Sequence, residues 1–166
     1  MKMMKATGAI NSNRARASGQ AQVEFALTIV FVFFVFVAII ELIMLVYAYN
    51  AIADSAKEGV RYAITHGTGT TNCSGPNNTS VTPNVPCDTA ANKVKAAVTD
   101  YAVWSLHGVA ATDITVNYNP NGDNGANCNK PGCAVRVEVH YVYQPFFGLG
   151  WPTLTVHAAS QGRIMF

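Results

Sequence analysis

Two glutamates beside or inside a long apolar run are the residues that packing alone explains least. Glu24 stands at the start of the run and Glu41 lies within it. An ionisable side chain at the centre of a membrane span costs about 2.5–3.5 kcal/mol on insertion scales. Glu41 is about two-thirds of the way along, so its cost is lower and protonation can reduce it further. Two interpretations stay open, a contact with another helix inside the membrane and a glutamate that reaches the outer headgroups.

Glu24 follows a candidate cleavage site by five residues. Ser18 and Gly19 end a basic leader, and Gln20 would become the first residue if the chain were cut after Gly19. A small residue lets an extended backbone enter a protease. Residues i and i+4 share a helix face, so the new α-amine of Gln20 would lie one turn from the Glu24 carboxylate. A carboxylate at a membrane edge needs such a cationic partner, from its own or a neighbouring chain.

The apolar run itself is long enough to cross a bilayer. Residues 25–40 contain no charge, Thr28 is their only polar side chain, and residues 42–49 continue the run after Glu41. The whole is about 25 residues, whereas a helix needs ~20 to span the hydrocarbon core. Residues 1–18 carry four basic residues and no acid, which places the N-terminus in the cytoplasm and everything after Asn50 outside. The basic residues are Lys2, Lys5, Arg14 and Arg16.

These features together resemble a known family. The Gly19–Glu24–Phe25 pattern, the apolar run with its internal Glu41 and the segment YNAIADSAKEGVRYA that follows are similar to TadE-like proteins. Those proteins are minor pseudopilins of the tight-adherence (Flp) pilus machinery and relatives of type IV pilins. The resemblance covers roughly residues 14–66. It implies cleavage between Gly19 and Gln20 by a prepilin peptidase and the role of the pilin glutamate for Glu24.

The resemblance also implies a function and a set of partners. The expected protein is a structural component of pilus biogenesis, with no catalytic activity and no cofactor. Its expected partners are the lipid bilayer, the prepilin peptidase and other pilin-like and Tad assembly proteins, without nucleic acid or a small-molecule substrate. The expected location is the bacterial inner membrane, with the C-terminal domain periplasmic and possible entry into the pilus.

Two other interpretations of the apolar run stay open. An ordinary signal peptide could be cut at the small-x-small site of residues 51–53, although the apolar region exceeds the usual length of about 7–15 residues. An uncleaved anchor would make the chain a single-pass, membrane-anchored extracytoplasmic binding or adhesion module without pilin processing. That module is the alternative function.

Charge and motifs argue against other classes of protein. Without the leader, seven Lys and Arg face nine Asp and Glu, a net charge of −2. Nucleic-acid binding needs a clustered basic face, which this composition does not provide. The sequence has no G-x-S-x-G, H-E-x-x-H or P-loop pattern. No Cys-x-x-Cys pair occurs and the histidines are not at ligand spacing, so no metal site is expected.

The four cysteines all follow the span, and an even number in an oxidising compartment indicates disulfides. Three connectivities are possible. The pairs Cys73–Cys87 and Cys128–Cys133 are favoured because each closes a short loop rich in Gly, Pro and Asn. By chain entropy a loop of about 15 residues contributes ~3 kcal/mol.

The rest of the chain predicts an α+β, type IV pilin-like fold in three regions. Residues 1–19 are a basic leader whose first eighteen residues we expect to be disordered, residues 20–66 belong to a long helix expected over 22–66, and residues 67–166 form the periplasmic head. A second helix is expected from Asp88 to about Leu106. Apolar alternation then predicts three antiparallel strands, at 114–118, 134–144 and 153–166.

Several large aromatic residues of the head have two possible roles. Tyr101 and Trp104 fall on the apolar stripe of the second helix, so we expect them in the core rather than on a binding surface. The segment PFFGLGWP, residues 145–152, is expected to tuck under the sheet. The alternative for this segment is an interaction patch or a membrane-interface patch.

Overall fold

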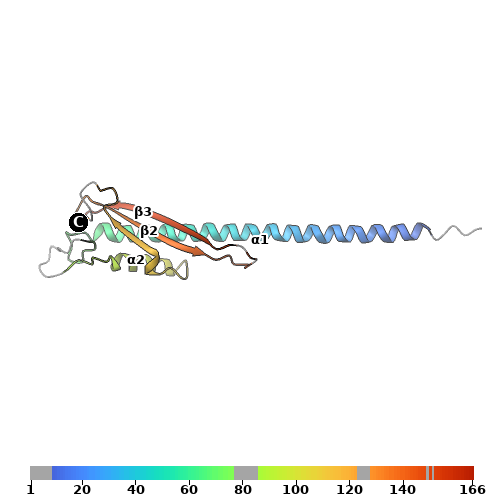
Figure 1. Cartoon of the computed structure of the whole chain (residues 1–166), viewed down its shortest axis with the longest axis horizontal. Helices are drawn as coiled ribbons and strands as arrows, with labels where there is room; N and C mark the ends of the chain where they lie inside the picture. Colours follow the sequence, from blue (N-terminus) through green and yellow to red (C-terminus); the bar gives the residue numbers. More distant parts are fainter. Residues whose placement is uncertain (1–8, 77–85, 123–127, 149, 151) are drawn as a thin grey trace, which may run out of the picture. The chain divides into compact units, whose positions relative to one another are not determined.

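The computed structural model describes residues 9–76, 86–122, 128–148, 150 and 152–166, with only the backbone described for 9–18. Its elements are two α-helices, a short 3₁₀ helix and three strands (Figure 1). The chain divides into two compact units, Met1–Ile43 and Met44–Phe166, and helix α1 (Ala9–Thr65) contributes to both. This is the expected α+β arrangement of a long apolar helix, a second helix and a three-stranded antiparallel sheet.

Helix α1 begins earlier than expected. The leader was predicted to be disordered, whereas the helical backbone already starts at Ala9. Residues 9–18 contain several Ala and Arg, which are good helix formers, and neither Gly nor Pro. The prediction gave too much weight to the polar composition and too little to the intrinsic helix propensity of these residues.

Helix α2 (Asn92–Val103) is shorter than predicted at both ends. Asp88 was expected to begin it, but Asp88 lies four residues upstream. Its Oδ2 still accepts a hydrogen bond from the backbone N–H of Lys93 at 2.6 Å, so it satisfies one of the free N–H groups of the first turn. The buried side of α2 consists of Val94, Val98 and Ala102, which follow one another at intervals of four.

Tyr101 and Trp104 are not in the core, contrary to the prediction. Tyr101 is 43 % exposed and Trp104 is 90 % exposed. At ~100° per residue, Tyr101 is turned about 100° and Trp104 about 200° away from the buried Ala102. Trp104 also stands just beyond the last residue of the helix, where no turn of α2 covers it.

The sheet has the order β1-β2-β3, with β1 at Ile114–Tyr118, β2 at Ala134–Tyr143 and β3 at Leu154–Arg163. Both pairs are antiparallel, and Val137 of β2 stands between Val116 and Ser160 in the register. The alternation predicted for β2 is present, since Val135, Val137 and Val139 are 0 % exposed. The 3₁₀ helix η1 (Ala111–Asp113) leads directly into β1.

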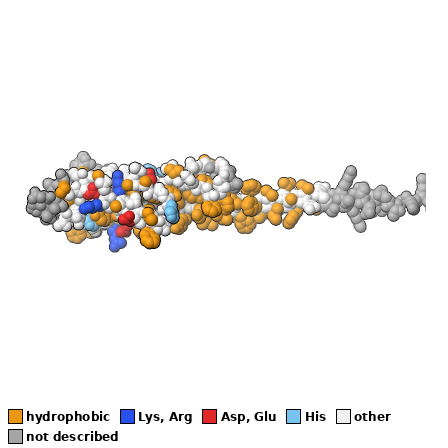
Figure 2. Space-filling view, turned by 90° about the horizontal axis from the view of Figure 1, so that it is seen from below, with side chains coloured by type: hydrophobic (Ala, Val, Ile, Leu, Met, Phe, Trp, Pro, Cys, Tyr) orange, Lys and Arg blue, Asp and Glu red, His pale blue; other side chains and the backbone are white. Residues whose placement is uncertain are grey.

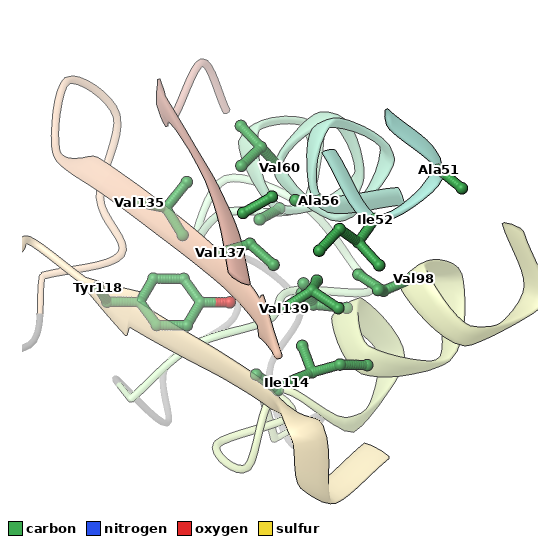
Figure 3. Packing of buried hydrophobic residues seen from close by; sticks show 14 of the residues in the cluster. Ala51, Ile52, Ala56, Val60, Val98, Ile114, Tyr118, Val135, Val137 and Val139 are labelled. Carbon is green, nitrogen blue, oxygen red and sulfur yellow. The ribbon is translucent and has the colours of Figure 1, made fainter. Parts of the chain in front are cut away.

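One face of the sheet packs against the two helices. Figure 3 shows Ile52 and Ala56 of α1 and Val98 of α2 facing Val137 and Val139 of β2. Two glycines, one in α1 and one in β3, permit this close approach. A Cβ on Gly59 would collide with Val98 Cγ2 and lie 3.2 Å from Val137 Cγ1. A Cβ on Gly162 of β3 would lie 2.7 Å from Val60 Cγ1 and 2.9 Å from Ile64 Cγ2. Tight helix–sheet contact therefore depends on residues without a side chain at these positions.

Candidate functional site

The predicted cleavage site lies in the helical part of the first unit. Gly19 is exposed, and a Cβ added to it would meet nothing within 4 Å. A methyl group at this position would therefore not be crowded by the described residues. The backbone is helical here, so cutting requires the helix to open locally. Gly in a helix costs about 1 kcal/mol relative to Ala, which lowers the cost of that opening.

Glu24 lies on the same helix face as Gln20, as their spacing predicts. Gln20 Nε2 donates to Glu24 Oε1 over 3.4 Å, and Thr28 Oγ1 donates to the Glu24 carbonyl oxygen over 2.8 Å. The first contact shows that the Glu24 carboxylate reaches back to residue 20. In a chain cut after Gly19, the same reach brings the carboxylate towards the new amino end of the helix, whose partial positive charge favours an anion.

Glu41 differs sharply from its neighbours. Its side chain is 4 % exposed, whereas Ile40 and Leu42 are 45 % and 63 % exposed. A carboxyl group removed from water in this way needs a hydrogen-bond partner or a proton. The side chain of Glu41 is therefore not exposed on the surface of the helix.

The surface of α1 around these groups is strongly apolar. A candidate membrane span covers Gly19–Thr65, with a mean hydropathy of 3.2 in its most apolar window, of which 11 % is buried. Phe31, Phe33 and Phe36 are each more than 60 % exposed. Figure 2 shows hydrophobic side chains covering the described helical stretch, while the Lys, Arg, Asp and Glu side chains in view lie over the head. Such a surface needs a non-aqueous environment or a protein partner to cover it.

Two disulfides close loops in the second unit. Cys73 is joined to Cys87 and Cys128 to Cys133, with Cα–Cα distances of 4.8 and 5.9 Å. This is the pairing that the sequence favours. The loops differ in length, with separations of 14 and 5 residues, so the chain-entropy contributions are ~3 and ~2 kcal/mol respectively.

A buried polar cluster beside these disulfides was not foreseen from the sequence. Tyr118 Oη donates to Ser74 Oγ over 3.0 Å, and Asn129 Nδ2 donates to the Ser74 carbonyl oxygen over 3.2 Å. Burial raises the pKa of the Tyr118 hydroxyl to about 12. The three residues come from separate segments, so the cluster fastens two loops to the end of β1. Loop residues show no periodicity, so no pattern in the sequence indicated that these three residues would come together.

Several His and acidic side chains approach one another on the described part of the head. Among the residues that the structure describes, no group of three or more His, Cys, Asp or Glu is placed to hold a metal ion. One shallow hollow of about 330 Å³ does bring together His107, Asp113 and His140. Across the strand pair, His140 faces His157 with ring centroids 5.9 Å apart, and Glu138 Oε1 lies 3.7 Å from His140 Nε2. The side chains of His140 and Glu138 are 46 % and 26 % exposed, so solvent screens their interaction.

The predicted aromatic segment divides between described and undescribed residues. Leu149 and Trp151 lie outside the residues that the structure describes. Phe146 is 74 % exposed and Phe147 is 39 % exposed, with their ring centroids 5.2 Å apart. The expectation that this segment tucks under the sheet is therefore wrong for Phe146, because Pro145 ends the strand and the following turn leaves the rings outside.

Comparison with known proteins finds a match for one segment of the chain. The model of the family described as TadE-like protein matches residues 19–61. This match covers about a quarter of the chain and includes Gly19, Glu24 and Glu41. No curated protein and no solved structure matches the chain. The match supports a component associated with the tight-adherence pilus, and that family is structural rather than enzymatic.

Proposed function

We propose, from this TadE-like segment, that the protein is a minor pseudopilin of tight-adherence pilus biogenesis. The observation that carries the proposal is the match over residues 19–61, because it begins at the candidate cleavage residue and continues through the apolar helix. The protein acts as a structural, membrane-anchored component and has no catalytic role. The head, residues 67–166, supplies the part that meets other components of the system.

The geometry at the start of the match supports processing after Gly19. The residue is exposed and unobstructed, and the carboxylate of Glu24 already reaches residue 20. After cleavage, the Gln20 amine and the Glu24 carboxylate form a complementary pair at a helix end. In an assembly, the amine of one chain and the carboxylate of its neighbour provide the same attraction between helices.

Lateral association through α1 is the second element of the proposal. Side chains such as Phe31 and Phe36, at 69 % and 61 % exposure, are accessible to lipid before assembly and to neighbouring pilin-like helices afterwards. Glu41 makes an intramembrane polar contact in this proposal. A carboxyl group held away from water needs a hydrogen-bond partner or a proton, and a polar group on a partner helix would supply one inside the membrane.

The proposed location is the inner membrane, with the leader in the cytoplasm and the head outside. Four basic residues and no acid precede the span. The disulfides at Cys73–Cys87 and Cys128–Cys133 lie on the other side of the span, and an oxidising compartment is where such bonds persist. The charge bias and the redox chemistry thus agree on one orientation.

The N-terminus of the protein recovered from membranes tests this proposal. We expect intact-mass measurement to give a chain that begins at Gln20 when the prepilin peptidase is present and at Met1 when it is absent. The variant Gly19→Leu should remain uncut, because a large side chain replaces the small residue at the cut. Glu24→Gln should still be cut yet lose pilus assembly, because it removes the charge and preserves the shape.

Two outcomes would contradict the proposal. A chain beginning at Met1 in the presence of an active peptidase would favour an unprocessed anchor and the alternative binding or adhesion module. A chain beginning at Asp54 would indicate an ordinary signal peptide cut after residues 51–53.

A further inference from the structure

Five exposed aromatic side chains of the second unit lie on, or directly beside, residues that line one hollow. We define the aromatic rim as Tyr47, Tyr49, Trp104, Phe146 and Phe147. Their exposed fractions are 51 %, 49 %, 90 %, 74 % and 39 % respectively. Three separate segments contribute to the rim, namely α1, the end of α2 and the turn after β2. Large exposed aromatic groups drawn from several segments mark a surface that something covers.

A shallow hollow joins these segments. It has a volume of about 260 Å³, and its lining includes Met44 and Tyr47 of α1, Leu106 after α2 and Phe146 after β2. None of its described lining residues is Asp, Glu, Lys or Arg; His107 is the one titratable imidazole among them. The hollow beside which the rim residues lie is therefore lined, among the described residues, without a carboxylate, ammonium or guanidinium group.

The position of the rim along α1 can be compared with the thickness of a bilayer. Counted from Phe25, a hydrocarbon core of about 30 Å takes ~20 helical residues and ends near Met44. The outer headgroup layer adds ~5–8 Å, or about three to five helical residues. It therefore reaches Tyr47 and, at its thicker limit, Tyr49. The first charged residue beyond Glu41 is Asp54, which lies past this layer.

We infer that the aromatic rim rests in the outer headgroup layer of the membrane and fixes the depth of the head against the lipid surface. The occupant of the rim is therefore lipid. Tyr and Trp are the residues enriched at this layer, because their rings are apolar and their O–H or N–H groups still reach water. Exposing the rings of Trp104 and Phe146 to water is unfavourable, whereas contact of the same rings with the headgroup layer is favourable. This inference rests on the membrane anchoring within the proposed function.

The loop closed by Cys128–Cys133 provides a matched control, because β2 separates it from Phe146 of the rim. Lys130 is exposed and lies in the loop closed by Cys128–Cys133, next to the end of β3 that carries Arg163. Arg163 Nη1 donates to the carbonyl oxygen of Gly132 in this loop over 3.0 Å. The loop precedes β2, whereas Phe146 follows β2, so the two positions lie at opposite ends of a ten-residue strand.

Depth-dependent fluorescence quenching tests the inference on the full chain in phosphatidylcholine–phosphatidylglycerol vesicles. The variant Trp151→Phe leaves Trp104 as the sole tryptophan. In a Trp104→Phe, Trp151→Phe background, Phe34→Trp reports on the span and Lys130→Trp on the far loop. Lipids brominated either high on the acyl chain or near its end then quench whichever tryptophan lies at that depth.

We expect Trp104 to lose fluorescence with lipids brominated near the headgroups and much less with lipids brominated near the bilayer centre. The Phe34→Trp probe should show the reverse preference, and Lys130→Trp should respond to neither. If Trp104 is unquenched by both lipids and freely quenched by acrylamide in the water, the inference is overturned. If Trp104 is shielded from lipid and from acrylamide alike, a second copy or another protein covers the rim, and the inference is again overturned.

The control probe separates this inference from the proposed function. Quenching of Phe34→Trp without quenching of Trp104 would overturn the rim alone and leave the membrane anchor intact. Loss of quenching at Phe34→Trp would show that the span does not insert, and both proposals would then be contradicted.

Discussion

One helix contains two regions that use apolar residues in opposite ways. Residues 19–43 of α1 carry large side chains that stay exposed, such as Phe33 at 61 %. From Ala48 onwards the buried residues of α1 are mostly small, including Ala56 and Ala63 at 0 %. Large exposed groups indicate that the covering surface comes from outside the chain, whereas small buried groups let a sheet approach closely. The apolar content of a helix is therefore less informative than the size of its residues and the direction in which they face.

The strongest way to test this comparison is to place the same charge on the exposed region of α1 and in the core against which the small-residue region of α1 packs. Val137→Asp puts a carboxylate into the core of the head, where Val137 is 0 % exposed, and should cost about 3–5 kcal/mol of unfolding free energy. Phe33→Asp should cost about 2.5–3.5 kcal/mol in membrane insertion and leave the head folded. Protease resistance of the head and carbonate extraction of membranes measure the two effects. The comparison fails if Phe33→Asp destabilises the head as much as Val137→Asp does.

A pH titration sharpens the comparison by examining a polar group that belongs to the head alone. The pKa of Tyr118 is raised by burial from 10.0 to about 12. Its neutral form is favoured in the folded state, so this stabilisation is fully present below about pH 10 and is lost as the pH rises to about 12. The loss should amount to about 2–3 kcal/mol. Urea unfolding across this range measures it.

The variant Tyr118→Phe is the control for that titration. It removes the ionisable hydroxyl and should remove the loss of stability between about pH 10 and pH 12. An unchanged slope in the variant would mean that the dependence comes from another group, such as Tyr62, whose pKa burial also raises.

We expect the smallest effect from replacing glycine by alanine at two positions of the same helix. Gly59→Ala forces a methyl group against Val98 and Val137 and should cost about 1–3 kcal/mol, because overpacking displaces well-packed side chains. Gly19→Ala meets nothing within 4 Å and should leave the thermal midpoint of the head unchanged. Differential scanning calorimetry distinguishes the two. Equal midpoints for both variants would contradict the close contact at Gly59.

Much of this architecture could be predicted because it depends on periodic signals. The alternation around Val135–Val139 predicted β2, and the uncharged stretch after Phe25 predicted the candidate span. In each case the burial of a side chain follows from its own sequence neighbourhood, which is the condition under which pattern reasoning succeeds.

The errors arose where burial depends on tertiary contacts or on the point at which an element ends. Trp104 fits an apolar stripe only if α2 continues, and α2 ends one residue earlier. The cluster of Ser74, Tyr118 and Asn129 joins segments that are far apart in the chain, so no local pattern contains it. For the candidate site, the spacing of Gln20 and Glu24 could be read directly from helical periodicity, whereas the burial of Glu41 could not.

The contact of Gly162 with Val60 also has a consequence for the order of folding. Val60 and Gly162 are about one hundred residues apart, and contacts of such separation form slowly because a long loop must close first. During synthesis at about 5–20 residues per second, the small-residue face of α1 is finished at least ~5 s before β3 exists. For that interval the face has no partner strand. The head therefore becomes complete only after its last strand has been made.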